Sequence, residues 1–235
     1  MVEPAMLPVN ALDVHLQMAD IPIIDTAALA ILGNDDLLLR LMCDKASQDQ
    51  INDYVPWTLH TARAFGLKVI NAGGANAFKC NAGQFDLDDL EPEYGVSSRQ
   101  ILQILQRANC ELGTPHPVHQ HCNHLGIPGN FKTALATMVA TQGLPMHLAH
   151  VQFYAYGNEG TCGFWSAAAQ LQEGFRHHPN ITMDVGQALF GQTVTISGDV
   201  IAQYSRHGDS NPNKWMMWDA ECEDSGRGAL SLSNW

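Results

Sequence analysis

Apolar positions along the chain alternate between short continuous runs and longer segments with helical spacing. The short runs are typical of buried strands, and they lie at 67–71, 117–122, 145–152, 181–185 and 214–219. The longer segments predict helices, at 35–43, 52–64, 99–109, 131–142 and 161–177. The apolar face of the helix at 99–109 continues to Leu112, and Gly113 is the expected C-terminal stop.

Strands that alternate with helices predict an α/β fold with parallel strands, because a parallel pair needs a long crossover connection. Right-handed crossovers build either an open doubly wound sheet or a closed barrel, and the hydrophobic pattern does not decide between them. No glycine-rich phosphate-binding loop follows any predicted strand, so the sequence gives no support for nucleotide binding.

Composition and charge argue against several classes of protein. The 235 residues are enough to bury a sizeable core, and the formal net charge of −12 argues against nucleic acid or an anionic membrane as the main partner. No apolar run reaches the ~18 residues of a membrane span, and no signal-peptide pattern opens the sequence. The six cysteines form no Cys-x-x-Cys pair, so we expect reduced thiols in a cytoplasmic protein. Eleven histidines are a first indication of metal chemistry.

Two histidines share one face of the predicted strand at 117–122. His119 and His121 lie two positions apart, and strand side chains alternate between faces with a period of two. His116 is an odd number of positions from both and is expected to face away. His121 is nearest the carboxyl end of the strand, where parallel α/β folds build their active sites. A pair of hydrogen-bonded core histidines and a functional pair remain about equally favoured.

The predicted strand at 145–152 carries two more histidines. His147 and His150 lie three positions apart, so they are expected on opposite faces and only one can join a site. His150 is the better candidate because it is closer to the carboxyl end. Neutral imidazole is the commonest nitrogen ligand of zinc, so one histidine at each of two successive strand ends would provide half of a metal site.

Lys79 follows the strand at 67–71 in a segment that is otherwise uncharged from Val69 to Gln84. It could be a surface lysine on a loop. It could also be a desolvated lysine with a lowered pKa, because burial favours the neutral amine. A neutral amine can combine with carbon dioxide to form a carbamate, whose oxygens could bridge two metal ions.

Three aspartates could complete such a site. Asp184 ends the strand at 181–185, and Asp199 and Asp219 follow it. Each could act as a base, as a metal ligand or as a partner that orients a ligating imidazole. Their spacing does not choose between them.

Four long segments resemble one known family, in the same order along the chain: 71–79, 116–130, 147–157 and 184–194. They are similar to the A subunit of formylmethanofuran dehydrogenases and of the bacterial formyltransferase/hydrolase complex. The resemblance extends from Val2 to about Asp224. It implies an amidohydrolase-type (β/α) barrel with a site for two zinc ions.

The resemblance also implies roles for individual residues. Lys79 matches the carboxylated bridging lysine, His121 and His150 match the strand histidines that bind metal, and His119 belongs to the same histidine-rich motif. The implied reaction is attack of a metal-bound hydroxide on a formamide carbonyl, because zinc lowers the pKa of bound water to ~7. The implied substrate is N-formylmethanofuran or an analogue, which is hydrolysed to formate or formed in reverse. The other subunits of the complex are the implied partners.

Some features of the family pattern are not found in this sequence. The family's His-x-His pair on its first strand has no counterpart, and the strand with the catalytic aspartate is expected beyond Trp235. His124 stands where the family has asparagine. We therefore expect residues 1–224 to form the central part of an incomplete barrel. The tail at 225–235 does not resemble the family and is expected to be disordered.

Two other functions remain as alternatives to this expected hydrolase subunit. One is a non-catalytic fragment or scaffold subunit that keeps the fold without a complete metal site. The other is a different amidohydrolase, such as a cyclic-imide hydrolase, which the four ordered segments disfavour.

Overall fold

The computed structural model describes residues 5–21, 23–80, 85–125, 129–157 and 166–185, and the backbone of 193–195 and 217–219. Six parallel strands form one sheet in the order of the sequence: β1 (Ala5–Met6), β2 (Leu29–Ile31), β3 (Gly66–Ile70), β4 (Val118–His121), β5 (Met146–Leu148) and β6 (Ile181–Met183). The α-helices are α1 (Ala11–Ala19), α2 (Asp36–Cys43), α3 (Gln48–Thr61), α4 (Gly74–Lys79), α5 (Ser98–Glu111), α6 (Phe131–Ala140) and α7 (Ala168–His177). Two 3₁₀ helices span Pro8–Asn10 and Val151–Tyr154.

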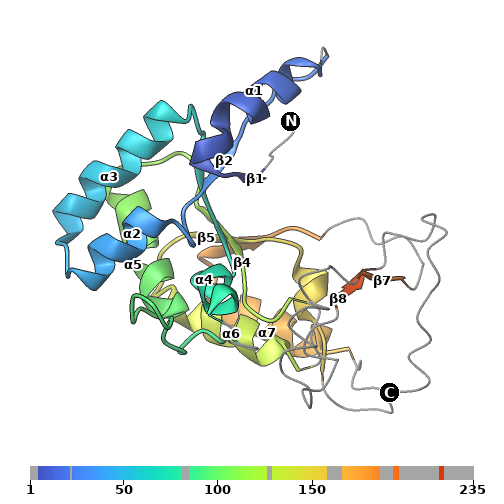
Figure 1. Ribbon diagram of the computed structural model, residues 1–235. Coiled ribbons are helices and arrows are strands. Elements are labelled where there is room, and N and C mark those ends of the chain that lie inside the picture. Colours follow the sequence, from blue (N-terminus) through green and yellow to red (C-terminus); the bar gives the residue numbers. More distant parts are fainter. Residues whose placement is uncertain are drawn as a thin grey trace.

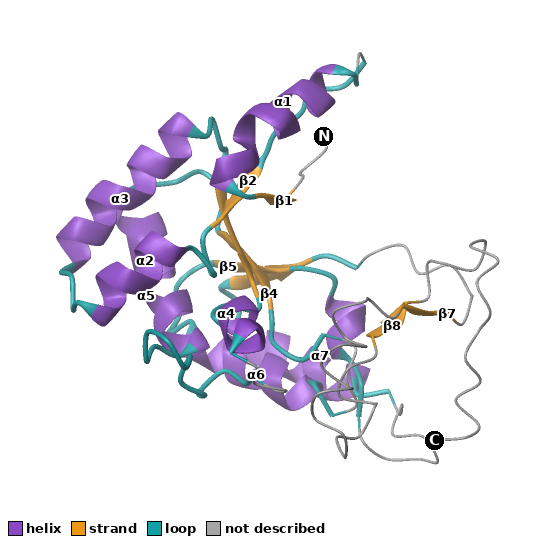
Figure 2. Cartoon of the chain, in the orientation of Figure 1, coloured by secondary structure: helices purple, strands orange, loops and turns teal. Residues whose placement is uncertain are grey.

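The order of the strands decides between the two parallel folds. An open doubly wound sheet reverses its strand order at a switch point, whereas a barrel wall adds each strand beside the preceding one. Here every strand from β1 to β6 pairs with its neighbour in sequence, and every pairing is parallel. Helices α2, α3, α5, α6 and α7 follow one another around the outside of the curved sheet (Figures 1 and 2). The predicted partial barrel of parallel strands alternating with helices is confirmed.

The two faces of the sheet differ in polarity. On the helix-facing side, alternate strand residues enter the main hydrophobic core: Leu67, Val69, Val118, Met146, Leu148 and Ile181. The residues between them point to the opposite face, which is the inside of the barrel wall. On this inner face the register brings Lys68, His119 and His147 into one row across β3, β4 and β5.

Helix α5 shows how the sequence fixes the outer layer. Ser97 and Gln100 form a capping box, in which each side chain accepts a hydrogen bond from the other residue's backbone N–H. Ile101, Leu105 and Ala108 are fully buried on its apolar face, as the spacing predicted. Gly113 ends this segment at φ 64°, a left-handed conformation that glycine adopts at little cost. No helix in the described part of the chain is long and apolar enough to cross a membrane.

Several predicted boundaries are wrong. Strands β1, with two residues, and β2, with three, were not predicted. The predicted strand at 145–152 ends at Leu148, where a turn and a 3₁₀ helix follow. Helix α3 begins at Gln48 instead of 52, and α7 begins at Ala168, with 161–165 outside the described residues.

The last predicted strand does not join the parallel sheet. Within 214–219, β8 (Met217–Asp219) pairs antiparallel with β7 (Thr193–Thr195). The tail at 225–235 lies outside the described residues, and its predicted disorder stays a prediction.

Replacing a core residue of α5 should destabilise the protein far more than replacing its exposed neighbour. We expect Leu105→Ala to lower the free energy of unfolding by about 2–5 kcal/mol, because Leu105 is 0% exposed and its loss leaves a cavity. Leu112→Ala is the control, since Leu112 is 38% exposed and should cost clearly less. Urea denaturation of both variants measures the difference, and equal losses would contradict the packing described here.

Candidate metal centre

A row of polar side chains crosses the inner face of the sheet. Lys68 on β3 pairs in register with His119 on β4, which pairs with His147 on β5, and His147 pairs with Thr182 on β6. Directly paired residues of neighbouring strands point to the same face. Four consecutive strands therefore each place one polar side chain in a single layer of the barrel interior.

His119 is the most buried imidazole of this layer. It is 6% exposed, and neither of its ring nitrogens has a hydrogen-bond partner. Burial, reinforced by the positive charge of Lys68, lowers the pKa of His119 from 6.5 to about 3. The same two causes, in the same order, lower the pKa of His121 to about 3. Both imidazoles are therefore neutral at pH 7, which is the form that binds metal ions.

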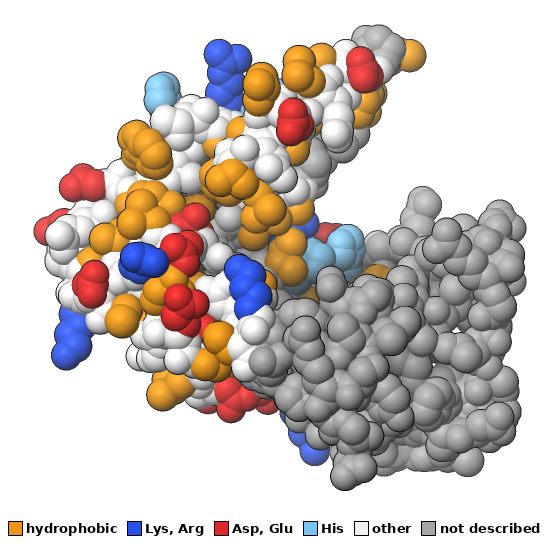
Figure 3. Space-filling model, viewed as in Figure 1, with side chains coloured by type: hydrophobic (Ala, Val, Ile, Leu, Met, Phe, Trp, Pro, Cys, Tyr) orange, Lys and Arg blue, Asp and Glu red, His pale blue; other side chains and the backbone are white. Residues whose placement is uncertain are grey.

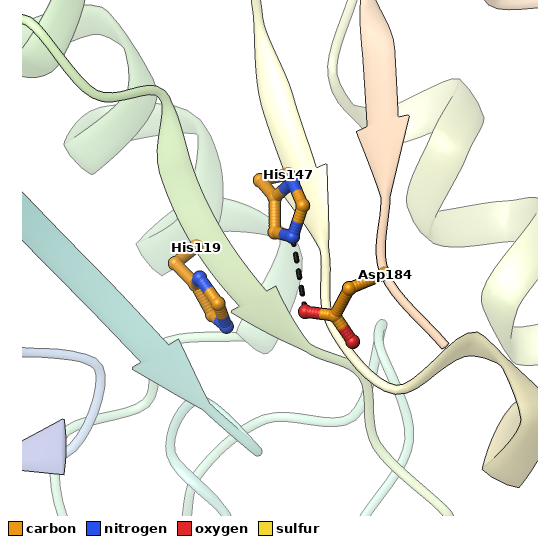
Figure 4. A group of neighbouring side chains, drawn as sticks. All are labelled: His119, His147 and Asp184. Atoms are coloured by element: carbon orange, nitrogen blue, oxygen red, sulfur yellow. Dashed lines mark hydrogen bonds and ion pairs between the residues drawn. The ribbon is translucent and has the colours of Figure 1, made fainter. Parts of the chain in front are cut away.

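Three groups lie close enough to share one metal ion. The possible ligand atoms of His119, His147 and Asp184 all lie within 4.8 Å of one another (Figure 4). His147 Nε2 lies 3.0 Å from Asp184 Oδ2, and His147 Nδ1 lies 2.8 Å from Thr182 Oγ1. Two histidines and one carboxylate are a common donor set for divalent transition metals.

A second layer lies one step closer to the carboxyl ends of the strands. The rings of His121 and His150 are 4.8 Å apart, and His121 Nε2 is buried without a hydrogen-bond partner. Asp184 connects the two layers, because its Oδ1 accepts a 2.6 Å hydrogen bond from His150 N–H and lies 3.2 Å from His150 Nδ1. In the space-filling view, histidine side chains gather at one place on the visible face (Figure 3).

The expectation that only one of His147 and His150 could join the site is wrong. Both contact Asp184. The period of two holds only within a strand, and β5 ends at Leu148. His150 adopts the left-handed conformation, with φ 51° and ψ 49°, so the chain turns before its side chain emerges. Sequence spacing could not show this turn.

The expectation that His116 faces away is also wrong. Its ring centroid lies 6.0 Å from that of His119 and 5.9 Å from that of His147. His116 precedes β4 and its Nδ1 contacts the carbonyl of Pro117, so strand alternation does not apply to it. His116 thus adds an imidazole beside His119 and His147, on the side of the amino ends of the strands.

Lys79 and Lys68 differ in burial. Lys79 ends α4 with an exposed side chain, and its ammonium donates to Asn76 Oδ1 over 3.3 Å. The desolvation considered for Lys79 is therefore not found. Lys68 is 7% exposed and lies in register with His119. Sequence reasoning missed Lys68, although a charged residue inside the otherwise apolar run at 67–71 was a visible signal.

Asp184 is the one of the three candidate aspartates whose side chain lies among the described residues at the site. Partial burial acts to raise its pKa, but the hydrogen bonds from His150 N–H and from His147 outweigh this effect, and the pKa is lowered. Asp184 is therefore an anion at neutral pH. The side chains of Asp199 and Asp219 lie outside the described residues.

Six parallel strands in sequence order, with a group of two histidines and one aspartate that could hold a metal ion, fit the arrangement of a partial (β/α) barrel with a candidate metal site. The comparison with protein families agrees, because the amidohydrolase family matches residues 1–226. This chain belongs to the amidohydrolase family.

Within this family, the chain is similar to a subunit of a complex that is named for formyl transfer and hydrolysis, and to a second relative. The chain is 46% identical to the FhcA component of the formyltransferase/hydrolase complex of Methylorubrum extorquens, over 100% of this chain and 45% of the relative. It is 31% identical to the protein FwdA of Methanocaldococcus jannaschii, over 94% of this chain and 41% of that protein. The crystal structure of the FhcABCD complex from Methylorubrum extorquens with methylofuran matches with a TM-score of 0.80 and 48% identity, over 89% of this chain and 39% of that one. The chain thus spans less than half the length of these relatives, and the resemblance found in the sequence is confirmed.

Acid should destabilise the metal-free protein through its two buried imidazoles. Their pKa falls from 6.5 to about 3 on folding, so the unfolded chain binds protons between these values that the folded protein does not. The free energy of unfolding should therefore fall as the pH drops from 6.5 toward 3.

Urea denaturation across this pH window measures the effect. His119→Gln should make the dependence on pH shallower, because one of the two groups is removed. His60→Gln is the matched control, since His60 is exposed on α3 and should leave the slope unchanged. Equal slopes for His119→Gln and the unmodified protein would contradict the assignment.

Proposed function

We propose that this chain is the portion of a metal-dependent formamide hydrolase that carries the central metal ligands of its active site. The observation that carries the proposal is the group of His119, His147 and Asp184, whose ligand atoms lie within 4.8 Å of one another. Similarity to FhcA over the whole chain supports the substrate class. The reaction is hydrolysis of an N-formylmethanofuran-type formamide to formate, or its reverse.

Zinc is the metal we propose, with two ions as in the family. The residues fit this metal, because unpartnered nitrogens of His119 and His121 are buried and neutral at pH 7. The two adjacent layers support two ions, with His119 and His147 in one layer and His121 and His150 in the other. When bound, zinc would lower the pKa of a coordinated water and polarise the formamide carbonyl. Asp184 contributes a carboxylate between the layers.

Lys68 is the better candidate for a carbamate than Lys79. Its side chain is buried in the same row as His119, whereas Lys79 is exposed. Its charge also lowers the pKa of both His119 and His121, which places it near both layers. In the carbamate, the lysine nitrogen bonds to the carbon of carbon dioxide and releases one proton. The product is an anion whose oxygens can bind metal.

The partners follow from the relatives. The Methylorubrum extorquens relative belongs to the FhcABCD complex, and the crystal structure of that complex holds methylofuran. We propose that this chain assembles with equivalent subunits and acts on a methanofuran-type substrate. The alternative, a non-catalytic fragment or scaffold subunit, keeps the same fold and predicts no formate release.

Removing one ligand should remove metal. We expect the purified protein to bind zinc, and His119→Ala to weaken binding by more than the about 10–100-fold that loss of an outer partner costs. His60→Ala is the control, because His60 is an exposed histidine on α3. Isothermal titration with zinc and formate release from an N-formyl substrate are the measurements. Zinc binding without formate release would favour the non-catalytic alternative, and absence of zinc binding would exclude the proposal.

The two lysines give a second, independent test. With ¹³C-labelled bicarbonate and zinc present, the unmodified protein should show a carbamate signal in its carbon NMR spectrum. Lys68→Gln should abolish this signal, and Lys79→Gln should retain it, because only Lys68 of the two is buried beside His119. The opposite result would restore the role that the sequence resemblance gives to Lys79.

A further inference from the structure

Asp184 makes all of its described contacts with the end of β5 and the turn after it. Its Oδ2 lies 3.0 Å from His147 Nε2, and its Oδ1 accepts the 2.6 Å hydrogen bond from His150 N–H. Its backbone N–H donates to Leu148 O, and its backbone carbonyl accepts from Val151 N–H. Figure 4 shows the carboxylate leaving the end of β6 and lying beside His147 on the neighbouring strand. One residue thus holds the segment 147–151 at four points.

His150 is the residue in this segment that needs support. Its φ of 51° and ψ of 49° lie in the left-handed region, which residues other than glycine adopt uncommonly. Such conformations persist when surrounding contacts fix them, and they gather at functional sites. The hydrogen bond to Asp184 Oδ1 is charge-assisted, because the carboxylate is an anion at neutral pH. The same oxygen lies 3.2 Å from His150 Nδ1, so it contacts both the backbone and the ring.

The left-handed turn decides where the His150 ring lies. With this turn its centroid is 4.8 Å from that of His121, and the two rings form the layer at the carboxyl edge. If the segment continued as a strand beyond Leu148, His150 and His147 would face opposite sides of the sheet. The ring would then be lost from the inner face.

We propose that Asp184 is a positioning residue that holds His150 in its left-handed conformation and so keeps its imidazole in the metal-binding layer. The inference rests on the metal site proposed above and revises one part of it: the imidazoles remain the metal ligands, and Asp184 acts through His150 in place of direct metal ligation. The competing role is that of a metal ligand.

Two substitutions at one position separate the two roles. In Asp184→Asn the amide oxygen can still accept from His150 N–H, but the negative charge is gone. In Asp184→Ala both are lost. A positioning role predicts that Asp184→Ala weakens zinc binding about 10–100-fold, as loss of an outer-shell partner does, while Asp184→Asn stays within about threefold of the unmodified protein. Asp53→Ala is the matched control, because Asp53 is an exposed aspartate on α3 and its removal should leave zinc binding unchanged.

A second readout does not require metal. The short hydrogen bond to a carboxylate should move the amide proton of His150 downfield in the NMR spectrum of the metal-free protein. The shift should persist in Asp53→Ala, remain in part in Asp184→Asn and disappear in Asp184→Ala. Asp184→Ser replaces Asp184→Ala if the latter fails to fold, since the shorter serine side chain should not reach the position of Oδ1.

The outcomes separate the two proposals. Equal losses of zinc affinity in Asp184→Asn and Asp184→Ala would overturn the positioning role and favour a ligating carboxylate. Unchanged affinity in Asp184→Ala, or an unchanged His150 amide shift in that variant, would also overturn it. If the unmodified protein binds no zinc, the proposed function fails, and the amide shift alone then supports or overturns the role of Asp184.

Discussion

The in-register pairing of β3, β4, β5 and β6 is the constraint on which the site depends. Lys68, His119 and His147 form one row only because their strands pair at these positions. A slip of one residue would turn each of these side chains toward the helices. The opposite face prevents such a slip, because the alternate residues are apolar and buried against the outer helices. The hydrophobic packing of the helices therefore fixes the geometry of polar groups that the helices do not touch.

Burial of the histidine row has an electrostatic cost. Ring nitrogens of His119 and His121 are buried without hydrogen-bond partners, and an unsatisfied buried polar atom costs about 1–3 kcal/mol. Burial together with the nearby charge of Lys68 also excludes protonation of both rings near neutral pH. Native proteins contain few such groups, and a metal ion would satisfy these nitrogens as ligands. The same arrangement thus destabilises the metal-free protein and favours metal binding, so metal binding and folding stability should be linked.

A second support lies at the carboxyl ends of the strands, where active-site loops begin. Asn123 follows β4 and is 0% exposed, and its Nδ2 lies 2.9 Å from both Asn71 Oδ1 and Ser98 Oγ. Asn71 follows β3 in a left-handed conformation with φ 42°. Asn34 follows β2, and its Nδ2 donates to Ile70 O over 2.8 Å. Short amide side chains thus connect three successive strand ends, while Asp184 plays the corresponding part between β6 and β5. The first residues after these strands are thus held by side-chain hydrogen bonds as well as by the sheet.

What could be predicted from the sequence depends on whether a feature lies within one regular element or arises from contacts between elements. Where strands and helices are regular, the period of apolar residues located β3, β4, β6 and α5 and placed His119 and His121 on one face. Outside the strands the period carried no information, so the predicted orientations of His116 and His150 were wrong. The prediction that His147 and His150 could not both join the site failed for the same reason. Lys68 was overlooked for a different reason: its position inside an apolar run was visible in the sequence, but its burial by neighbouring strands was not. Residues within one element were therefore predictable, whereas the ligand set is produced by contacts between elements. Asp184 illustrates this most clearly, because its carboxylate, just past the end of β6, accepts a hydrogen bond from a histidine that follows another strand.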